Sequence, residues 1–248
     1  MALNVTLRMF RYRPDQSARY DTFQVTVPDA ANVLDAIEQA WAQHDRALMF
    51  RHACHHASCG TCAVRVNGRE VLPCIVPVKK YLDDAKPLTI EPLKNFPLVG
   101  DLVVDVANFF QKQEASGLVI TRPTEHKLEG KPIAYDKGLD PETVETVPFN
   151  RFENCIECGI CLSACPTMAA SVKFFGPASL AALERELDKT TDPQRRARLL
   201  ELADDEQGVW RCHSAWECTE TCPQNVRPAE AIMALRRRIF AQRFGFGK

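Results

Sequence analysis

The chain has 248 residues, of which 46% are hydrophobic and 25% charged, a globular composition with room for one large domain or two ordinary ones. Its formal net charge of −1 at pH 7 argues against nucleic acid as the main partner, because a phosphate-binding surface usually leaves a basic excess. No apolar run approaches the roughly 18–20 residues of a membrane helix, and the opening MALNVTLRMFRYRPD lacks a signal-peptide layout. We therefore expect that this chain does not itself cross a membrane.

The first 100 residues are predicted to form mostly strands, with one helix among them. Apolar and polar residues alternate over 23–27 (FQVTV), which is the period of a half-buried strand. Asn32 occupies the N-cap position before VLDAIEQAW, and Asp35 follows it at a capping-box spacing. A strand followed by a capped helix is therefore expected ahead of the first cysteines.

A hairpin and a closing strand are predicted after those cysteines. The Asn67-Gly68 pair separates the short runs AVRV and REVL, which is a strong β-hairpin signal. TIEPL at 89–93 is predicted to be the last strand of the sheet. From Asp101 the period changes, and DLVVDVANFFQKQ (101–113) is predicted to be helical.

The second half of the chain is predicted to be helical after an extended connector. Residues 117–150 are rich in turn residues and charge, whereas Pro177, Pro193 and Pro228 each mark the first turn of a helix. Two cysteine motifs separated by helical sequence indicate an internal duplication in this half. The predicted division is a first domain over 1–105, a connector over 106–150 and a second domain over 151–248.

Eleven cysteines are the most informative feature of the sequence. Disulfides are disfavoured in a chain that carries no export signal, and an odd number of cysteines cannot pair off completely. Buried structural cysteines would be scattered singly, but all of these fall into three clusters. The clusters favour metal or redox chemistry.

The first cluster, CHHASCGTC followed by a later cysteine, has the plant-type ferredoxin spacing for a 2Fe–2S centre. Several sulfurs must converge on two irons, which requires a loop; Ser58 and Gly60 allow a tight path and supply N–H donors for cluster sulfur. A Rieske centre is the competing interpretation because of His55 and His56, but its second histidine is missing, since the required position holds Arg65. The histidines are therefore expected to be loop residues. The predicted ligands are Cys54, Cys59, Cys62 and Cys74.

The second cluster, NCIECGICLSACP (154–166), has the bacterial ferredoxin spacing for a 4Fe–4S centre. Paired CxxC motifs also bind zinc, which is the competing interpretation. A run of four cysteines closed by proline, in a chain that also carries a plant-type motif, favours iron and sulfur.

The third cluster, RCHSAWECTETCP (211–223), repeats the second but has Ala215 where the second has Cys158. In two-cluster ferredoxins the fourth cysteine of such a run ligates the other cluster. This crossing predicts one complete set of four thiolates and one set of three, and three thiolates suit a 3Fe–4S cluster. The predicted 4Fe–4S ligands are Cys155, Cys158, Cys161 and Cys222, and the predicted 3Fe–4S ligands are Cys165, Cys212 and Cys218.

These motifs, together with NFPLVGDLVVD after the first domain, resemble the iron–sulfur subunit of the succinate dehydrogenase and fumarate reductase family over essentially the whole chain. The resemblance implies an α+β fold class, with an N-terminal β-grasp plant-type 2Fe–2S ferredoxin domain followed by an all-α helical ferredoxin domain. It also implies a flavoprotein partner carrying covalently bound FAD and the dicarboxylate site, and membrane-anchor subunits near a quinone, either ubiquinone or menaquinone. The implied function is electron transfer from that FAD through the 2Fe–2S, 4Fe–4S and 3Fe–4S clusters to quinone, or the reverse during fumarate reduction, with no catalytic residue in this chain.

The same resemblance suggests quinone-proximal residues. Pro166 and His213 match positions near quinone in the succinate dehydrogenase branch, Ala215 lies in the same loop, and Trp216 could supply an aromatic ring or serve in the core. That branch usually has a tryptophan shortly after the proline, but CPTMAAS has none here. This difference weakens the inference that the quinone contacts of that branch also occur in this chain. The arginines at 236–238 are interpreted as a solvated helix face rather than a contact with anionic lipid.

Several alternatives stay open at this stage. The same architecture could serve another oxidoreductase, such as a thiol-linked fumarate reductase or a glycolate-oxidase-type subunit. A zinc-stabilised binding module and a free soluble ferredoxin are the other classes, and the set of three different motifs disfavours both. The chain is expected to be a peripheral subunit on the cytoplasmic face of a prokaryotic cell membrane.

Overall fold

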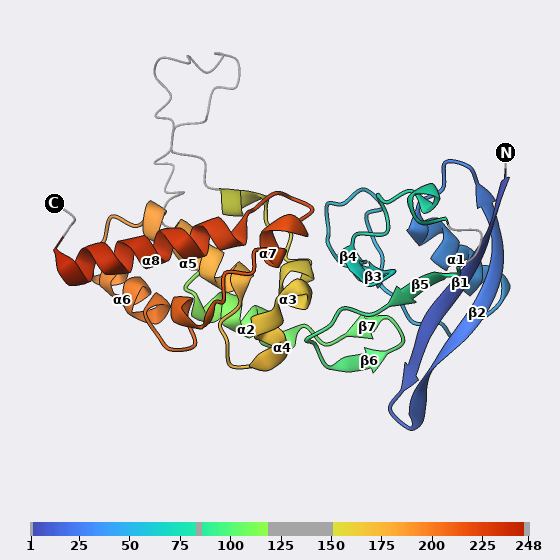
Figure 1. Cartoon of the computed structure of the whole chain (residues 1–248), viewed down its shortest axis with the longest axis horizontal. Coiled ribbons are helices and arrows are strands. Elements are labelled where there is room, and N and C mark those ends of the chain that lie inside the picture. The colour runs from blue at the N-terminus through green and yellow to red at the C-terminus, as the bar shows by residue number, and fades with distance from the viewer. Residues whose placement is uncertain (1, 83–85, 119–150, 246–248) are drawn as a thin grey trace, which may run out of the picture.

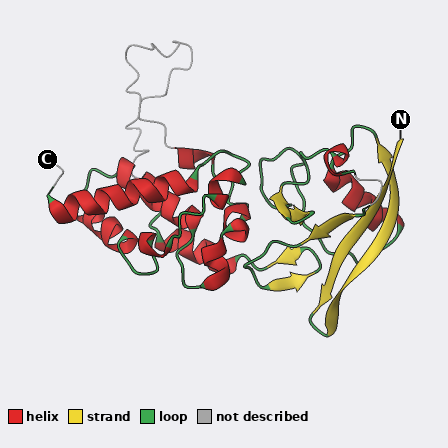
Figure 2. Ribbon diagram, viewed as in Figure 1, coloured by secondary structure: helices red, strands yellow, loops and turns green. Residues whose placement is uncertain are grey.

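The computed structural model describes residues 2–82, 86–118 and 151–245, with the strands gathered toward one end and the helices toward the other (Figures 1 and 2). The longest strands are β1 (Ala2–Arg13) and β2 (Gln16–Pro28), which pair antiparallel. In both strands every second side chain is buried over the inner stretch, as the alternation predicted. The strand predicted over 23–27 is confirmed.

A five-stranded mixed sheet, in the order β2-β1-β5-β3-β4, forms the first half. β5 (Leu88–Glu91) lies parallel to β1 and antiparallel to β3 (Val64–Val66), which pairs antiparallel with β4 (Arg69–Val71). Asn67 and Gly68 have φ of 48° and 82°, the two left-handed positions of a type I′ turn, so the predicted hairpin is confirmed. A short 3-10 helix, η1 (Val78–Tyr81), precedes β5.

Helix α1 (Val33–Gln43) lies against this sheet. Its N-cap is Asn32, and the Asp35 carboxylate accepts a hydrogen bond from the Asn32 N–H at 2.8 Å in the predicted capping box. The helix buries one apolar stripe against the sheet, consisting of Val33, Leu34, Ala36, Ile37 and Ala40. The opposite face of α1 carries polar residues, among them Glu38.

The helix predicted over 101–113 is wrong in its first half. A small hairpin, β6 (Leu98–Gly100) and β7 (Val103–Val104), occupies this stretch, and helix α2 begins only at Ala107 and ends at Ala115. The turn forms around Asp101, whose buried carboxylate accepts hydrogen bonds from the N–H groups of Tyr12 (3.0 Å) and Met49 (2.8 Å). These long-range bonds hold the segment against the first domain, and no local pattern announces them.

The regular elements of the second half are all helices in its described residues. The three prolines predicted to start helices do so, at α5 (Pro177–Lys189), α6 (Pro193–Ala203) and α8 (Pro228–Phe244). The shorter elements are η2 (Arg151–Asn154), α3 (Ile160–Ala164), α4 (Pro166–Ala170), η3 (Val209–Arg211) and α7 (Glu217–Glu220). Helices α5 and α8 form the centre of this half, where Leu180, Leu183, Ile232, Leu235 and Ile239 belong to one buried cluster.

The sheet-and-helix half followed by a helical half confirms the expected α+β fold class. Residues 107–115, placed in the connector by the predicted division, form α2, and Phe109 packs into the core of the helical half. The remainder of the predicted connector, 119–150, lies outside the described residues. Within the described residues, no helix combines the length and the apolar character that crossing a membrane requires.

A second buried cluster joins the two halves. It includes Leu34 and Leu72 from the first half and Ile160 from the second, together with two cysteines of the first cluster. Polar contacts reinforce it: the Ser163 hydroxyl donates to the Glu70 carboxylate at 2.9 Å and accepts from the Lys94 N–H at 2.8 Å. The halves are therefore joined by a packed interface, which sets the relative positions of their cysteine loops.

Candidate metal centres

All eleven cysteines are free thiols and lie in the described residues. Three cysteines of the first group lie in the loop between α1 and β3, and the fourth, Cys74, follows β4. Cys54 Sγ accepts hydrogen bonds from the N–H groups of His56 (3.5 Å), Ser58 (3.3 Å) and Cys59 (3.3 Å). These bonds lower the pKa of the Cys54 thiol to about 6, the His56 N–H contributing most. The loop thus stabilises a thiolate before any metal is considered.

The curvature of this loop comes from left-handed backbone. His55, Ala57 and Gly60 have φ of 61°, 58° and 69°, which turns successive N–H groups inward. On the other side of the group Cys62 and Cys74 are buried, and burial raises the pKa of Cys62 to about 12. The site has a polar, N–H-rich side and an apolar side.

The helical half separates its seven cysteines into two cavities. The first cavity is lined by three cysteines of the second motif and by Cys222 from the third. The second cavity is lined by Cys165 from the second motif, together with Cys212 and Cys218 from the third. The last cysteine of each run therefore lies with the other run, which is the arrangement that the crossing rule predicted.

The two cysteine runs share one backbone path. Glu157 and Gly159 have φ of 53° and 77°, and the equivalent Ser214 and Trp216 have φ of 57° and 64°. Each left-handed pair leads directly into a short helix, α3 or α7. The internal duplication is thus real at the level of conformation, although tryptophan takes a position where glycine would be unstrained.

The buried sulfur groups of the helical half fit a bound metal better than free thiols. Burial raises the pKa of Cys155 to about 12, that of Cys158 to about 11 and that of Cys218 to about 12, so these groups alone would be neutral. Cations bound among them would stabilise the thiolates. Backbone donors complete the environment, since Val226 N–H donates to Cys222 Sγ at 3.3 Å and Ser214 N–H to Cys212 Sγ at 3.4 Å.

The 2Fe–2S loop touches the first of these cavities directly. A Cβ on Gly60 would lie 2.7 Å from the Ile156 carbonyl oxygen and 2.8 Å from Cys158 Cβ, so only glycine allows this approach. Gln224, two residues after Cys222, donates from Nε2 to the Ala57 carbonyl at 2.8 Å. The first cysteine loop is therefore packed against the second run and hydrogen-bonded to the residue that directly follows the third run.

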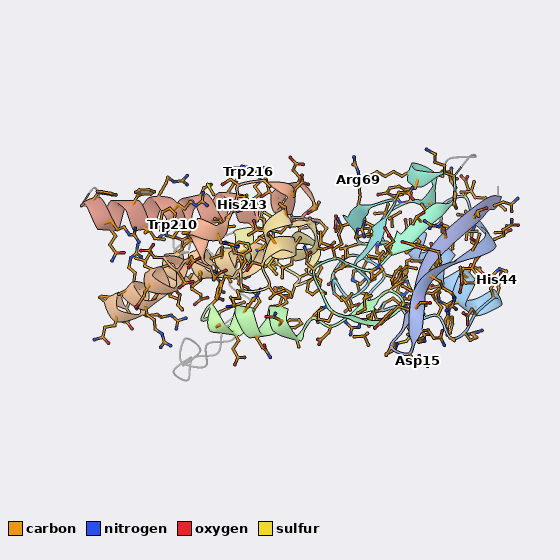
Figure 3. The ribbon with its side chains drawn as sticks, turned by 60° about the horizontal axis from the view of Figure 1, so that its bottom comes forward. Asp15, His44, Arg69, Trp210, His213 and Trp216 are labelled. Atoms are coloured by element: carbon orange, nitrogen blue, oxygen red, sulfur yellow. The ribbon has the colours of Figure 1, made fainter. Side chains whose placement is uncertain are left out.

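The second cavity opens at the protein surface. Pro166, His213, Ala215 and Trp216, the predicted quinone-proximal residues, all line it and are all exposed. Figure 3 labels His213 and Trp216 on the helical half, next to Trp210. The structure thus brings these residues together beside the three-cysteine group.

Two positioning residues were missed at the sequence level. Asn95, with φ of 65°, directs Nδ2 at the carbonyls of Leu162 (2.8 Å), Ser163 (3.0 Å) and Cys165 (3.2 Å). Arg236 donates to the carbonyls of Val209 and Cys212. Nothing in the local sequence around either residue signals these contacts.

The interpretation of 236–238 as a solvated face is wrong for two of its three arginines. Arg236 is committed to the loop of the third cysteine motif, and Arg238 forms ion pairs with Glu184 and Asp188 of α5. Arg237 is exposed. A helix packed between the cysteine loop and α5 draws its arginines inward because carbonyls and carboxylates face it.

Comparison with known proteins agrees with this architecture. A family model described as a 2Fe-2S iron-sulfur cluster binding domain matches residues 6–111, and one described as a 4Fe-4S dicluster domain matches residues 151–226. The chain is 33% identical over 236 residues to the fumarate reductase iron-sulfur subunit of Haemophilus influenzae, covering 92% of this chain and 90% of that protein. It belongs to the succinate dehydrogenase and fumarate reductase iron–sulfur subunit family.

Members of both branches of this family are similar to the chain. The mitochondrial succinate dehydrogenase [ubiquinone] iron-sulfur subunit 2 of Oryza sativa subsp. japonica is 31% identical, over 92% of this chain and 73% of that protein. Among solved structures, a chain of the Mycobacterium smegmatis Sdh1 complex in the apo form matches with a TM-score of 0.75 and 25% identity, over 98% of both chains. The protein is an iron–sulfur electron-transfer subunit of this family.

Proposed function

We propose that the chain carries electrons from FAD in a flavoprotein partner to membrane quinone, as part of a succinate:quinone oxidoreductase. The observation that carries this proposal is the division of the cysteines into sets of four, four and three. When loaded, such sets hold 2Fe–2S, 4Fe–4S and 3Fe–4S clusters, each of which accepts and releases single electrons. The same chain working in the direction of fumarate reduction is the alternative.

The ligand assignment follows from the grouping. The 2Fe–2S site would use Cys54, Cys59, Cys62 and Cys74; the 4Fe–4S site Cys155, Cys158, Cys161 and Cys222; and the 3Fe–4S site Cys165, Cys212 and Cys218. Ala215 has no donor atom with which to hold a fourth iron. That gap distinguishes the last site from the one before it.

The protein's own contribution is to hold the sulfurs, supply N–H donors and exclude water. The three N–H groups on Cys54 Sγ would stabilise added negative charge and raise the reduction potential there. The close approach at Gly60 keeps the first two sites near each other, because its hydrogen side chain admits the Ile156 carbonyl. Electron transfer between them would need no motion of the two halves.

The exposed mouth of the second cavity supports an exit toward quinone. Pro166, His213, Ala215 and Trp216 surround it, and a lipid-soluble ring could reach it from an anchor subunit. The partners that the proposal requires are therefore a flavoprotein on the 2Fe–2S side and one or more membrane anchors on this side. The chain would then be a peripheral subunit at the cytoplasmic face of the membrane.

Purification with its partners tests the proposal. One cluster of each kind predicts about 9 irons and about 10 acid-labile sulfides per chain, with three separable EPR signals. Stoichiometric zinc without sulfide would contradict the electron-transfer function. Assays with ubiquinone and menaquinone analogues then compare the two directions. Faster succinate oxidation supports the first reading and faster fumarate reduction the alternative, and a failure of both reactions in a fully loaded complex would reject both.

A further inference from the structure

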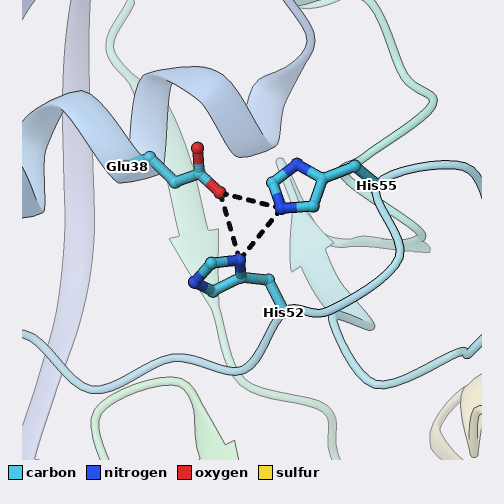
Figure 4. Close-up of side chains that lie close together, drawn as sticks. All are labelled: Glu38, His52 and His55. Atoms are coloured by element: carbon cyan, nitrogen blue, oxygen red, sulfur yellow. Dashed lines mark hydrogen bonds and ion pairs between the residues drawn. The ribbon is translucent and has the colours of Figure 1, made fainter.

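A second group of metal-ligand side chains lies behind the first cysteine loop. Glu38 on the outer face of α1 meets His52 and His55 from the loop that follows (Figure 4). His52 Nδ1 lies 3.1 Å from His55 Nε2 and 3.2 Å from Glu38 Oε1, and His55 Nε2 lies 3.5 Å from the same oxygen. None of the three belongs to the predicted iron–sulfur ligands, and the proposed electron transfer makes no use of them.

The three distances have the dimensions of a coordination site. Ligand atoms about 2.0–2.1 Å from a tetrahedral zinc ion are separated from one another by about 3.3–3.4 Å. The observed separations of 3.1, 3.2 and 3.5 Å lie on either side of that value and close to it. A single cation placed on the axis of this triangle would therefore contact all three atoms without rearrangement of the backbone.

The local structure holds each side chain in place. His52 stacks on Phe50, with ring centroids 5.1 Å apart and an interplanar angle of 15°. His55 has φ of 61°, a left-handed conformation that turns its ring back toward α1. Glu38 lies in the second turn of α1, whose N-terminus is capped by Asn32 and Asp35. Preorganisation of this kind is what a metal site requires.

Hydrogen bonding among the three groups leaves one atom unsatisfied. Glu38 Oε1 is buried and accepts no hydrogen bond of good geometry from the described residues. His52 Nδ1 faces two neighbours, yet carries at most one proton. A cation would satisfy the carboxylate and both imidazole nitrogens together.

We propose that Glu38, His52 and His55 bind a divalent transition-metal ion of the zinc class, with the fourth position open to water. Two imidazoles and one carboxylate suit zinc-class ions, whereas magnesium and calcium prefer oxygen ligands alone. The open position would face the adjoining cavity, whose wall includes Asp35, Gln39 and Trp41. Such an ion would clip the cysteine loop to α1 immediately beside Cys54.

Zinc uptake by the intact, cluster-loaded complex tests the site. The wild-type protein is expected to bind one additional zinc per chain, with iron and sulfide contents unchanged. X-ray absorption at the zinc edge should give nitrogen and oxygen neighbours at about 2.0–2.1 Å and no sulfur at about 2.3 Å. Sulfur neighbours would mean that zinc had entered a cysteine site instead, and the proposal would be wrong.

Variants identify the ligands. Glu38→Gln, His52→Gln and His55→Gln should each weaken zinc binding by at least about 10-fold. His44→Gln is the matched control, since His44 lies just past the end of the same helix and its Nε2 contacts the Gln24 carbonyl instead. It should bind zinc as the wild type does. The 2Fe–2S EPR signal of each variant verifies that the loop still folds.

The result that overturns the proposal is equally defined. If the complex takes up no zinc, or if the three variants bind it as tightly as the His44→Gln control, then Glu38, His52 and His55 form only a hydrogen-bonded contact. Because the iron count and the electron-transfer assays are independent of zinc, either outcome leaves the proposed function untouched. The two proposals can therefore fail separately.

Discussion

The two cysteine runs of the helical half, 154–166 and 211–223, follow the same path but occupy different surroundings. The first run lies against the 2Fe–2S loop, with Ile156 and Cys158 in contact with Gly60. The second run opens to the surface among His213, Ala215 and Trp216. One loop conformation thus occurs both at an interior position and at the protein surface.

What differs between the runs is a side chain rather than the backbone. Ala215 stands at the position of Cys158, while the left-handed residues on either side of it are retained. If the proposed clusters are bound, the missing thiolate would remove one iron site and one negative charge, and both changes would raise the reduction potential. The run at the surface would thus have a higher reduction potential than the interior run, which favours its role as electron acceptor.

The strongest test of this comparison asks which cluster the last cysteine of each run binds. Cys222→Ala should abolish the 4Fe–4S signal, although Cys222 is in the second run. Succinate:quinone turnover should fall by at least about 100-fold, because even outer-shell losses reach about 10–100-fold. EPR of the reduced complex and iron analysis provide the measurement.

Cys165→Ala is the reciprocal variant. It should remove the 3Fe–4S signal and leave the 4Fe–4S signal in place. If each variant instead lost the cluster of its own run, the crossed assignment would be wrong.

A second test disturbs the contact between the interior run and the first cysteine loop. Gly60→Ala places a methyl group 2.7 Å from the Ile156 carbonyl oxygen at a φ of +69°. We expect a loss of about 3 kcal/mol in unfolding free energy from strain and overpacking together. Electron transfer from the first site to the second should slow by about 10-fold. Thermal denaturation and rapid-mixing reduction kinetics measure the two effects.

Gly68→Ala is the matched control for this change. Its φ of +82° imposes similar strain, but the nearest atom to the new Cβ is Arg65 Nη2 at 4.0 Å. It should cost about 1 kcal/mol and leave the transfer rate unchanged. Equal slowing in both variants would show that contact between the loops is unimportant.

The third test removes the difference between the runs. Ala215→Cys restores a thiol beside Cys165, Cys212 and Cys218 and should admit a fourth iron. The potential of the site should fall by on the order of 100 mV, and quinone reduction should slow accordingly. Ala215→Ser, which adds a poor iron ligand, is the control. An undiminished EPR signal of the oxidised 3Fe–4S cluster in the cysteine variant would refute the assigned geometry.

The smallest expected effect concerns how the surface run is supported. Arg236→Gln removes charged donors from the carbonyls of Val209 and Cys212. The expected cost is about 1.5–3 kcal/mol in unfolding free energy. Arg237→Gln, on the exposed side of α8, should change stability by no more than about 0.5 kcal/mol. Denaturant titration of both variants checks this difference, and equal stabilities would exclude a supporting role for Arg236.

The sequence predicted those features that depend on local spacing. The capped helix α1, the Asn67-Gly68 hairpin and the proline-started helices all follow from short-range backbone preferences. Cysteine grouping was accessible for the same reason, since ligand spacing within a run is local and the crossing rule supplies the rest.

Features that depend on tertiary contact were not predicted. Leu102, Val103 and Val104 form a continuous apolar run that suits a buried strand or a helix equally. The buried Asp101 decides between them, because its carboxylate accepts hydrogen bonds from the N–H groups of Tyr12 in β1 and of Met49. The contact of Gln224 with Ala57 joins residues 167 positions apart. His55 of the first motif was interpreted only as a loop residue, because its proximity to Glu38 depends on how α1 lies beside that loop.

The crossing of Cys165 and Cys222 has a consequence for folding. With both sites filled, the chain between the two runs, which includes α5 and α6, would be tied at both ends like a loop closed by a pair of disulfides. Closing a loop of this length removes about 4 kcal/mol of unfolded-chain entropy on the chain-entropy model. Neither site could be completed by one run alone, so filling either site would hold the two runs together. The crossed ligands would thus add to the stability of the folded helical half beyond what its apolar core supplies.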